Sequence, residues 1–105
     1  RLMKIKIQNL TFDCIIGILP FERKTKQKVI INISFKYKFK DNEFINYADV
    51  ASYIEKTIKK EEFLLIEDAL LFVKKYLKSK YSINKLKLSI SKPNILDNCE
   101  VSVTL

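Results

Sequence analysis

The sequence predicts an α+β fold in which an antiparallel four-stranded sheet carries two helices on one face. Four segments alternate apolar and polar residues with the period of two that half-buried strands show. Two segments between them repeat apolar residues at helical spacing. Strands on either side of a pair of helices, in the order ββααββ, are typical of the α+β class. The 105 residues are the length of one domain.

The first strand is expected to begin over residues 3–8, where apolar residues alternate with lysine and glutamine. Asn9 interrupts this alternation, and an apolar stretch resumes at 12–18, which holds the only glycine, Gly17. Residues 20–28 are polar and are expected to form a loop. The first strand is therefore expected to be broken near its middle.

The second strand, over residues 31–40, has the clearest alternation in the chain. Its apolar face holds Ile31, Ile33, Phe35, Tyr37 and Phe39, and its polar face holds Asn32, Ser34, Lys36, Lys38 and Lys40. Successive side chains of a strand point to opposite faces, so the sheet has one dry face and one wet, positively charged face. Both helices are expected on the dry face.

The first helix is expected over residues 47–60. Asn46 is a favourable N-cap, and Asp49 places a carboxylate where the first turn has free N–H groups. The second helix is expected from about residue 65 to residue 78, because its apolar residues repeat at helical spacing. They are Ile66, Ala69, Leu70, Val73, Tyr76 and Leu77.

Two further strands are expected at residues 86–90 and 101–105, joined by a loop over 92–98 that Pro93 opens. An open sheet of four strands has two edges, which tend to pair with copies of the same chain. Closure into a barrel of several subunits removes those edges. We therefore expect a cyclic homo-oligomer.

The composition excludes several kinds of site. The chain has no histidine, so a Ser-His-Asp or Cys-His arrangement is ruled out and a zinc site is close to excluded. Cys14 and Cys99 are interpreted as small core residues in a reducing compartment. No apolar run approaches the roughly 20 residues that span a bilayer, and no signal-peptide pattern begins the chain. We expect a soluble, cytoplasmic protein with no membrane partner.

The net charge is +8, which is often found in proteins that bind nucleic acid or other anions. The lysines alternate with strand residues and form no block, so a compositional bias is the preferred interpretation. A nucleic-acid-binding module would use the face of Lys36, Lys38 and Lys40. The aromatic residues of that strand point to the opposite face, where bases could not share one platform with the lysines. No nucleic-acid partner is expected.

Four short stretches stand in a familiar order: Ile15–Arg23, Asn46–Val50, Leu64–Glu67 and Ser91–Pro93. Together with the order of elements, they resemble the dihydroneopterin aldolases of folate biosynthesis over the whole chain from Met3. Arg1 and Leu2 precede this methionine and are interpreted as remnants of an expression tag, so that the domain is expected to span residues 3–105. The resemblance implies the tunnelling fold (T-fold), in which subunits assemble side by side into a barrel. It further implies an octamer of two stacked tetrameric rings, with a single tetramer as the alternative, and active sites between neighbouring subunits.

The resemblance implies a lyase that cleaves 7,8-dihydroneopterin into 6-hydroxymethyl-7,8-dihydropterin and glycolaldehyde by a retro-aldol reaction. Family members use neither a metal nor a Schiff base, so no cofactor is expected. Lys92 matches the catalytic lysine of the family, Glu22 a glutamate that contacts substrate, and Tyr47 a tyrosine that enters the site from the adjacent subunit. The resemblance implies that all three take part in catalysis. The plain alternatives are an exposed loop lysine, an exposed glutamate and a tyrosine that packs on the core.

Glu67 matches the residue that anchors the pterin in the family. The pterin presents N3–H and a 2-amino group side by side, which a carboxylate can accept as a fork. The alternative is a carboxylate that stabilises the first turn of a helix. The backbone of Ile66 is expected to add a hydrogen bond, and Ile18 and Ile45 to flank the ring.

The segment 41–45 is shorter than the acidic segment that the family usually has before Asn46. The nearest alternative function is an epimerase that acts on the 2′ carbon of dihydroneopterin or its triphosphate. The basic residues of 23–28 would suit a triphosphate. An epimerase releases no glycolaldehyde, so product analysis separates the two activities.

Overall fold

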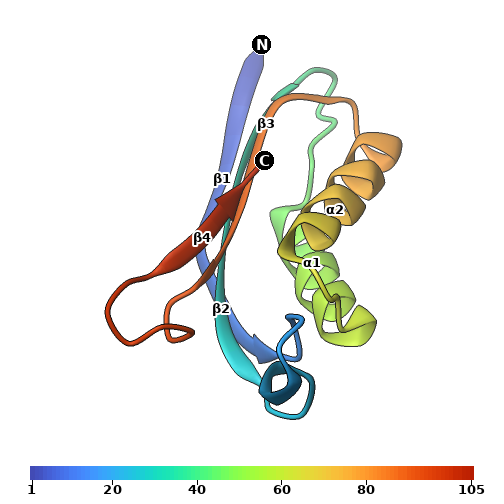
Figure 1. Cartoon of the computed structure of the whole chain (residues 1–105). Helices are drawn as coiled ribbons and strands as arrows, with labels where there is room; N and C mark the ends of the chain where they lie inside the picture. Colours follow the sequence, from blue (N-terminus) through green and yellow to red (C-terminus); the bar gives the residue numbers. More distant parts are fainter.

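The structure is a computed structural model that describes residues 1–105, and its strands and helices form two layers (Figure 1). The elements are β1 (Leu2–Cys14), η1 (Pro20–Arg23), β2 (Gln27–Lys38), α1 (Tyr47–Glu61), α2 (Ile66–Lys80), β3 (Ile83–Lys92) and β4 (Val101–Thr104). The strands lie in the order β1-β2-β3-β4, each antiparallel to its neighbour. Figure 1 shows α1 and α2 on the same side of this sheet. The predicted order ββααββ is confirmed.

β1 is one continuous strand, so the expected break at Asn9 is wrong. The register between β1 and β2 shifts between Ile7 and Leu10, and Asn9 has a φ of 60°. The N–H of Asn9 donates to Oδ1 of Asn32 at 2.8 Å. A bulge of this kind adds one residue without ending the strand. It also restores the apolar face, since Leu10 and Phe12 then point to the same side as Ile7.

β2 begins earlier than expected because the longer β1 pairs with it. Gln27 lies opposite Cys14 and Lys28 opposite Asp13, so neither belongs to a loop. The rest of the segment expected as a loop contains the short helix η1. At the other end of the pair, Leu2 lies opposite Lys38, so β1 begins before Met3.

The two helices begin close to the predicted residues. Oδ1 of Asn46 accepts a hydrogen bond from the N–H of Ala48 at 2.9 Å, which confirms Asn46 as the N-cap of α1. α1 ends where Glu62 adopts a left-handed conformation, with a φ of 46°. α2 extends two residues beyond the expected end. Neither helix is long and apolar enough to cross a membrane.

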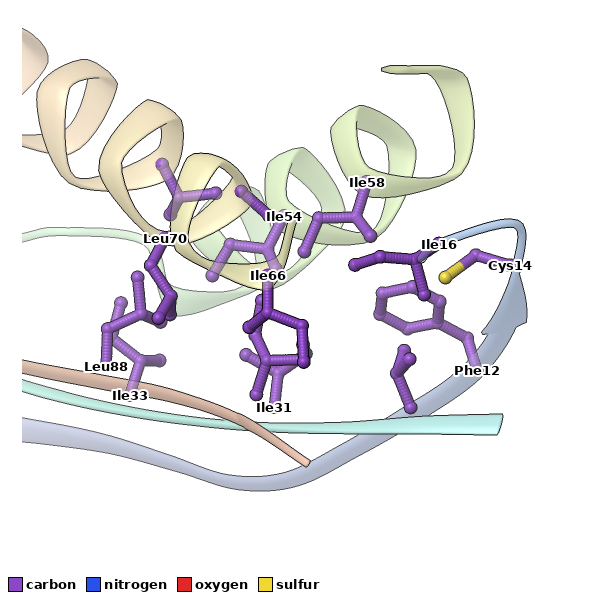
Figure 2. Close-up of a cluster of buried hydrophobic side chains, with 14 of the residues drawn as sticks. Phe12, Cys14, Ile16, Ile31, Ile33, Ile54, Ile58, Ile66, Leu70 and Leu88 are labelled. Carbon is purple, nitrogen blue, oxygen red and sulfur yellow. The ribbon is translucent and has the colours of Figure 1, made fainter. Parts of the chain in front are cut away.

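The core lies between the helices and the sheet. Figure 2 shows Phe12, Cys14 and Ile16 gathered near Ile58 of α1. Burial raises the pKa of the Cys14 thiol to about 11, although the nearby Lys92 lowers it. Cys99 is exposed in the loop before β4, so its assignment to the core is wrong. A residue in a connecting loop has no opposing layer to bury it.

Candidate active site

A buried ion pair joins the end of β3 to η1. Nζ of Lys92 lies 2.7 Å from Oε2 of Glu22, and the two residues are 6% and 3% exposed. They are the only buried charged residues in the chain. Lys92 was expected in a loop, but it is the last residue of β3 and continues the inward-facing row of Leu88 and Ile90. The structure therefore brings together two of the three predicted catalytic residues.

The carboxylate of Glu22 is held by three donors. Oε1 accepts from the N–H of Leu19 at 3.1 Å, and Oε2 accepts from Nε2 of Gln27 at 2.8 Å as well as from Lys92. Burial by itself raises the pKa of the Glu22 carboxyl. The hydrogen bonds from Lys92, Gln27 and Leu19 outweigh that effect, so the net pKa lies below the usual range. Glu22 is thereby kept as an anion.

The sequence prediction misses Gln27 as a site residue, because it places residues 20–28 in a loop. Its Nε2 also donates to the backbone carbonyl of Ile16 at 2.7 Å, so it links Glu22 to the segment that follows β1. A signal for this role was present in the sequence. Gln27 lies two residues before Val29 and four before Ile31, and residues at such spacing in a strand point to the same face. A strand that begins at residue 27 therefore places the amide of Gln27 on the core side.

Gly17 makes room for the Glu22 carboxylate. Its φ is 130°, a conformation that residues with side chains rarely adopt. A Cβ at this position would overlap the carboxylate of Glu22. The only glycine in the chain is therefore needed for both its backbone angle and its lack of a side chain.

Arg23 fastens this loop to the connection between α1 and α2. Its Nη1 donates to the carbonyls of Gly17 at 3.1 Å and Phe63 at 3.2 Å, and its Nη2 to that of Glu62 at 2.9 Å. The N–H of Gly17 also donates to the carbonyl of Phe63 at 3.0 Å. These bonds satisfy carbonyl groups just beyond the end of α1. They bring the start of α2 to the same end of the molecule as Lys92.

Ile66 and Glu67 begin α2, three and four residues after Phe63. Figure 2 shows Ile66 above Ile31, between Leu70 and the cluster of Phe12, Cys14 and Ile16. Ile66 is buried and Glu67 is exposed in the first turn of α2. Ile18, next to Gly17, is 63% exposed. Ile18 lies in the connection between β1 and η1, and Ile66 and Glu67 lie in the first turn of α2.

Tyr47 and Ile45 are not brought to this end of the chain. Tyr47 is the first residue of α1. The hydrogen bond from Gly17 goes to Phe63, just beyond the opposite end of the helix. The helix has 15 residues and is about 21 Å long at about 1.5 Å per residue. Tyr47 is 67% exposed, and Ile45 is half-buried. Within one chain, α1 therefore separates Tyr47 from the end that holds Lys92.

The fold is shared with solved structures that are 17–22% identical in sequence. A putative dihydroneopterin aldolase (FolB) from Vibrio cholerae has a TM-score of 0.88 at 22% identity and covers 98% of this chain and 94% of that one. The E. coli dihydroneopterin aldolase, in complex with neopterin, has a TM-score of 0.86 at 20% identity and coverage of 98% and 96%. A dihydroneopterin aldolase from Burkholderia thailendensis, bound to guanine, has a TM-score of 0.81 at 17% identity and coverage of 99% and 88%. The chain thus has the T-fold of these enzymes.

Sequence comparison identifies the family. The dihydroneopterin aldolase of Haemophilus influenzae is 30% identical over 97 residues, which are 86% of this chain and 82% of that protein. The folic acid synthesis protein fol1 of Schizosaccharomyces pombe is 29% identical over 93 residues, which are 89% of this chain and 12% of that protein. The family model described as FolB: Dihydroneopterin aldolase matches residues 5–105. This chain belongs to the dihydroneopterin aldolase family, whose members are aldolase-type lyases of folate biosynthesis.

Proposed function

We propose that this chain cleaves 7,8-dihydroneopterin into 6-hydroxymethyl-7,8-dihydropterin and glycolaldehyde. The observation that carries the proposal is the buried pair of Lys92 and Glu22, whose charged atoms are 2.7 Å apart. A buried ion pair is often no more stabilising than apolar residues of the same volume. Charged groups that are buried together and open toward bound substrate are typical of catalytic sites.

The proposed reaction is a retro-aldol cleavage. A base takes the proton from the 2′ hydroxyl, the bond between C1′ and C2′ breaks, and glycolaldehyde leaves. The electron pair of that bond moves into the ring, where the C6=N5 imine accepts it as N5 takes up a proton. An acid then protonates C1′, and N5 releases its proton as the imine forms again. The electron sink belongs to the substrate, so the chemistry requires neither a metal ion nor a Schiff base.

Lys92 supplies the acid–base function in this proposal, through a water molecule. The Glu22 anion holds the ammonium group of Lys92 in place and can accept hydrogen bonds from that water or from the substrate hydroxyls. Gln27 and the N–H of Leu19 fix the carboxylate, so the pair is oriented before substrate binds.

Glu67 anchors the pterin ring in this proposal. Its exposed carboxylate is free to accept N3–H and the 2-amino group, with the backbone of Ile66 adding a further hydrogen bond. Neopterin in the E. coli structure and guanine in the B. thailendensis structure both carry such an edge. Ile18 lies at the same end and can cover one face of the ring.

Tyr47 and Ile45 come from a neighbouring copy of the chain in this proposal, which completes the site between two subunits. The exposed apolar residues support an interface here: Ile18, Phe21, Leu64 and Leu65 flank the Lys92 end, and Phe44 and Tyr47 flank the start of α1. The outer strands β1 and β4 also leave two open sheet edges for closure into a ring. A tetrameric ring, stacked in pairs as an octamer, is the expected assembly.

The test is to incubate the protein with 7,8-dihydroneopterin and a metal chelator and to analyse the products. Release of both glycolaldehyde and 6-hydroxymethyl-7,8-dihydropterin supports the proposal. If the substrate is isomerised and no glycolaldehyde is released, the activity is that of an epimerase and the aldolase proposal is wrong. Unchanged substrate contradicts both. A Lys60→Ala variant removes an exposed lysine of α1 and is the control for substitutions of Lys92, because it removes one positive charge outside the ion pair.

A further inference from the structure

We propose that the face of the sheet opposite the helices binds a short chain of phosphate groups in a groove lined by Lys4, Lys6 and Lys87. The groove has a volume of about 310 Å³ and crosses all four strands. Figure 1 shows that no helix covers this face. The proposal needs only the groove of a single chain and does not depend on the aldolase activity.

The strand register places the cationic side chains around hydroxyl and amide groups. Lys6 lies opposite Ser34, and Ser34 lies opposite Lys87, so two lysines stand on either side of one serine. Neighbouring strands are about 4.8 Å apart, which puts the two lysine backbones about 10 Å from each other. That separation is wider than one phosphate group and suits a chain of two or three. Asn32, Ser89 and Thr104 line the rest of the groove as further polar partners.

The positive charge of the molecule is concentrated on the sheet. Apart from Lys92, which faces the core, the four strands contain seven lysines and one carboxylate, whereas the two helices contain seven lysines and five carboxylates. The one strand carboxylate, Asp13, lies opposite Lys28, far along β1 from Lys4.

No carboxylate neutralises the lysines of the groove. The two ion pairs of the molecule are Lys59 with Glu55 and Lys92 with Glu22, and neither lies on this face. Lys4 stands directly opposite Lys36, and like charges across a strand pair are destabilising. A bound polyanion relieves this repulsion, so binding is expected to raise the stability of the folded chain.

The lining favours phosphate groups over nucleic acid. Lysine is a point charge that suits phosphate oxygens, and hydroxyl and amide groups can donate to the same oxygens. Bases need an aromatic platform on which to stack. The groove contains no aromatic side chain, and Phe35 and Tyr37 of β2 pack toward the core.

The test measures binding of inorganic tripolyphosphate to the purified protein by titration calorimetry, at low and at near-physiological KCl concentration. The Lys6→Gln/Lys87→Gln variant is expected to bind about tenfold more weakly or worse, because two charge-assisted contacts are lost. The Lys56→Gln/Lys78→Gln variant removes two exposed helical lysines and is the matched control, expected to stay within about twofold of the unchanged protein. A rise in Tm with tripolyphosphate is expected for the control and not for the groove variant.

Further arms identify the source of the phosphate chain. A nucleoside triphosphate that binds as well as tripolyphosphate, with the same sensitivity to Lys6→Gln/Lys87→Gln, supports the proposal. Equal weakening by both double variants, or no binding at near-physiological salt, overturns it. Tighter binding of a single-stranded oligonucleotide, compared at equal phosphate concentration, also overturns it. Since binding is measured directly, failure of the aldolase proposal leaves this test unaffected.

Discussion

The carboxylate of Glu22 occupies the space where a side chain on Gly17 would lie. This relationship links the backbone of one loop residue to the position of a buried anion. That anion in turn holds Lys92, which is 70 residues further along the chain. The geometry of the ion pair therefore depends on a position that carries no functional group.

Gly17→Ala is expected to lower both stability and turnover. The added Cβ collides with Glu22, and the backbone angle is strained for alanine, at a cost of about 1–3 kcal/mol for the strain alone. Urea unfolding measures the loss. In a Glu22→Ala background the same substitution is expected to cost less, because the collision is gone. An equal cost in both backgrounds would show that the carboxylate does not occupy this space.

Replacement of the ion pair is expected to separate stability from catalysis. Lys92→Met leaves the Glu22 anion buried without its cation and is expected to destabilise the fold by about 3–5 kcal/mol. Glu22→Gln/Lys92→Met removes both charges and is expected to recover most of that stability while turnover of dihydroneopterin stays lost. Urea unfolding and product formation are measured on the same preparations. Near-normal turnover in the double variant would exclude the proposed acid–base role.

Glu22 is expected to make folding more sensitive to acid. Its pKa is lower in the folded chain than in the unfolded chain, so its contribution to stability is fully present above the unfolded pKa of about 4.3. The contribution is lost as pH falls from there through the folded pKa. Glu22→Gln should therefore reduce the difference in unfolding free energy between neutral and acidic pH. Glu100→Gln, at an exposed position, is the control and should leave that difference unchanged.

Glu67→Gln is expected to weaken pterin binding by about 10- to 100-fold, the effect of losing a hydrogen bond to a charged group. Calorimetric titration with neopterin measures the change. Asp68→Asn is the matched control, because Asp68 is the next carboxylate in the same exposed turn of α2. If both variants bind neopterin equally well, Glu67 is a helix-stabilising carboxylate and not the anchor.

Two inactive variants are expected to restore activity to each other. If Tyr47 acts across a subunit boundary, Tyr47→Ala and Lys92→Met damage different halves of the same site. Co-expressed, they form some sites that hold neither substitution, and turnover returns. Native mass spectrometry verifies that mixed oligomers are present. Mixed oligomers without turnover would contradict a site shared between subunits.

The types and order of the elements were predictable from the sequence because the signals for them are local. Alternation identified the strand that contains Ile31, and the helix that begins at Tyr47 follows from the cap at Asn46. The four short stretches that resemble the family, together with the lack of histidine, indicated the function class. Each of these signals extends over a few neighbouring residues, so the amino-acid sequence alone is enough to detect it.

Only the tertiary structure decided how long β1 is, where Gln27 lies and what surrounds Glu22. A bulge at Asn9 looks like the end of a strand until its partner β2 is present to continue the pairing. Glu22, in a charged segment of the sequence, is buried because Gly17, Gln27 of β2 and Lys92 of β3 lie against its carboxylate. The family resemblance assigns Tyr47 and Lys92 to one site, yet the length of α1 keeps the two apart in one chain. Periodicity predicts which face of an element is buried, but the contacts between residues far apart in the sequence exist only in the folded chain.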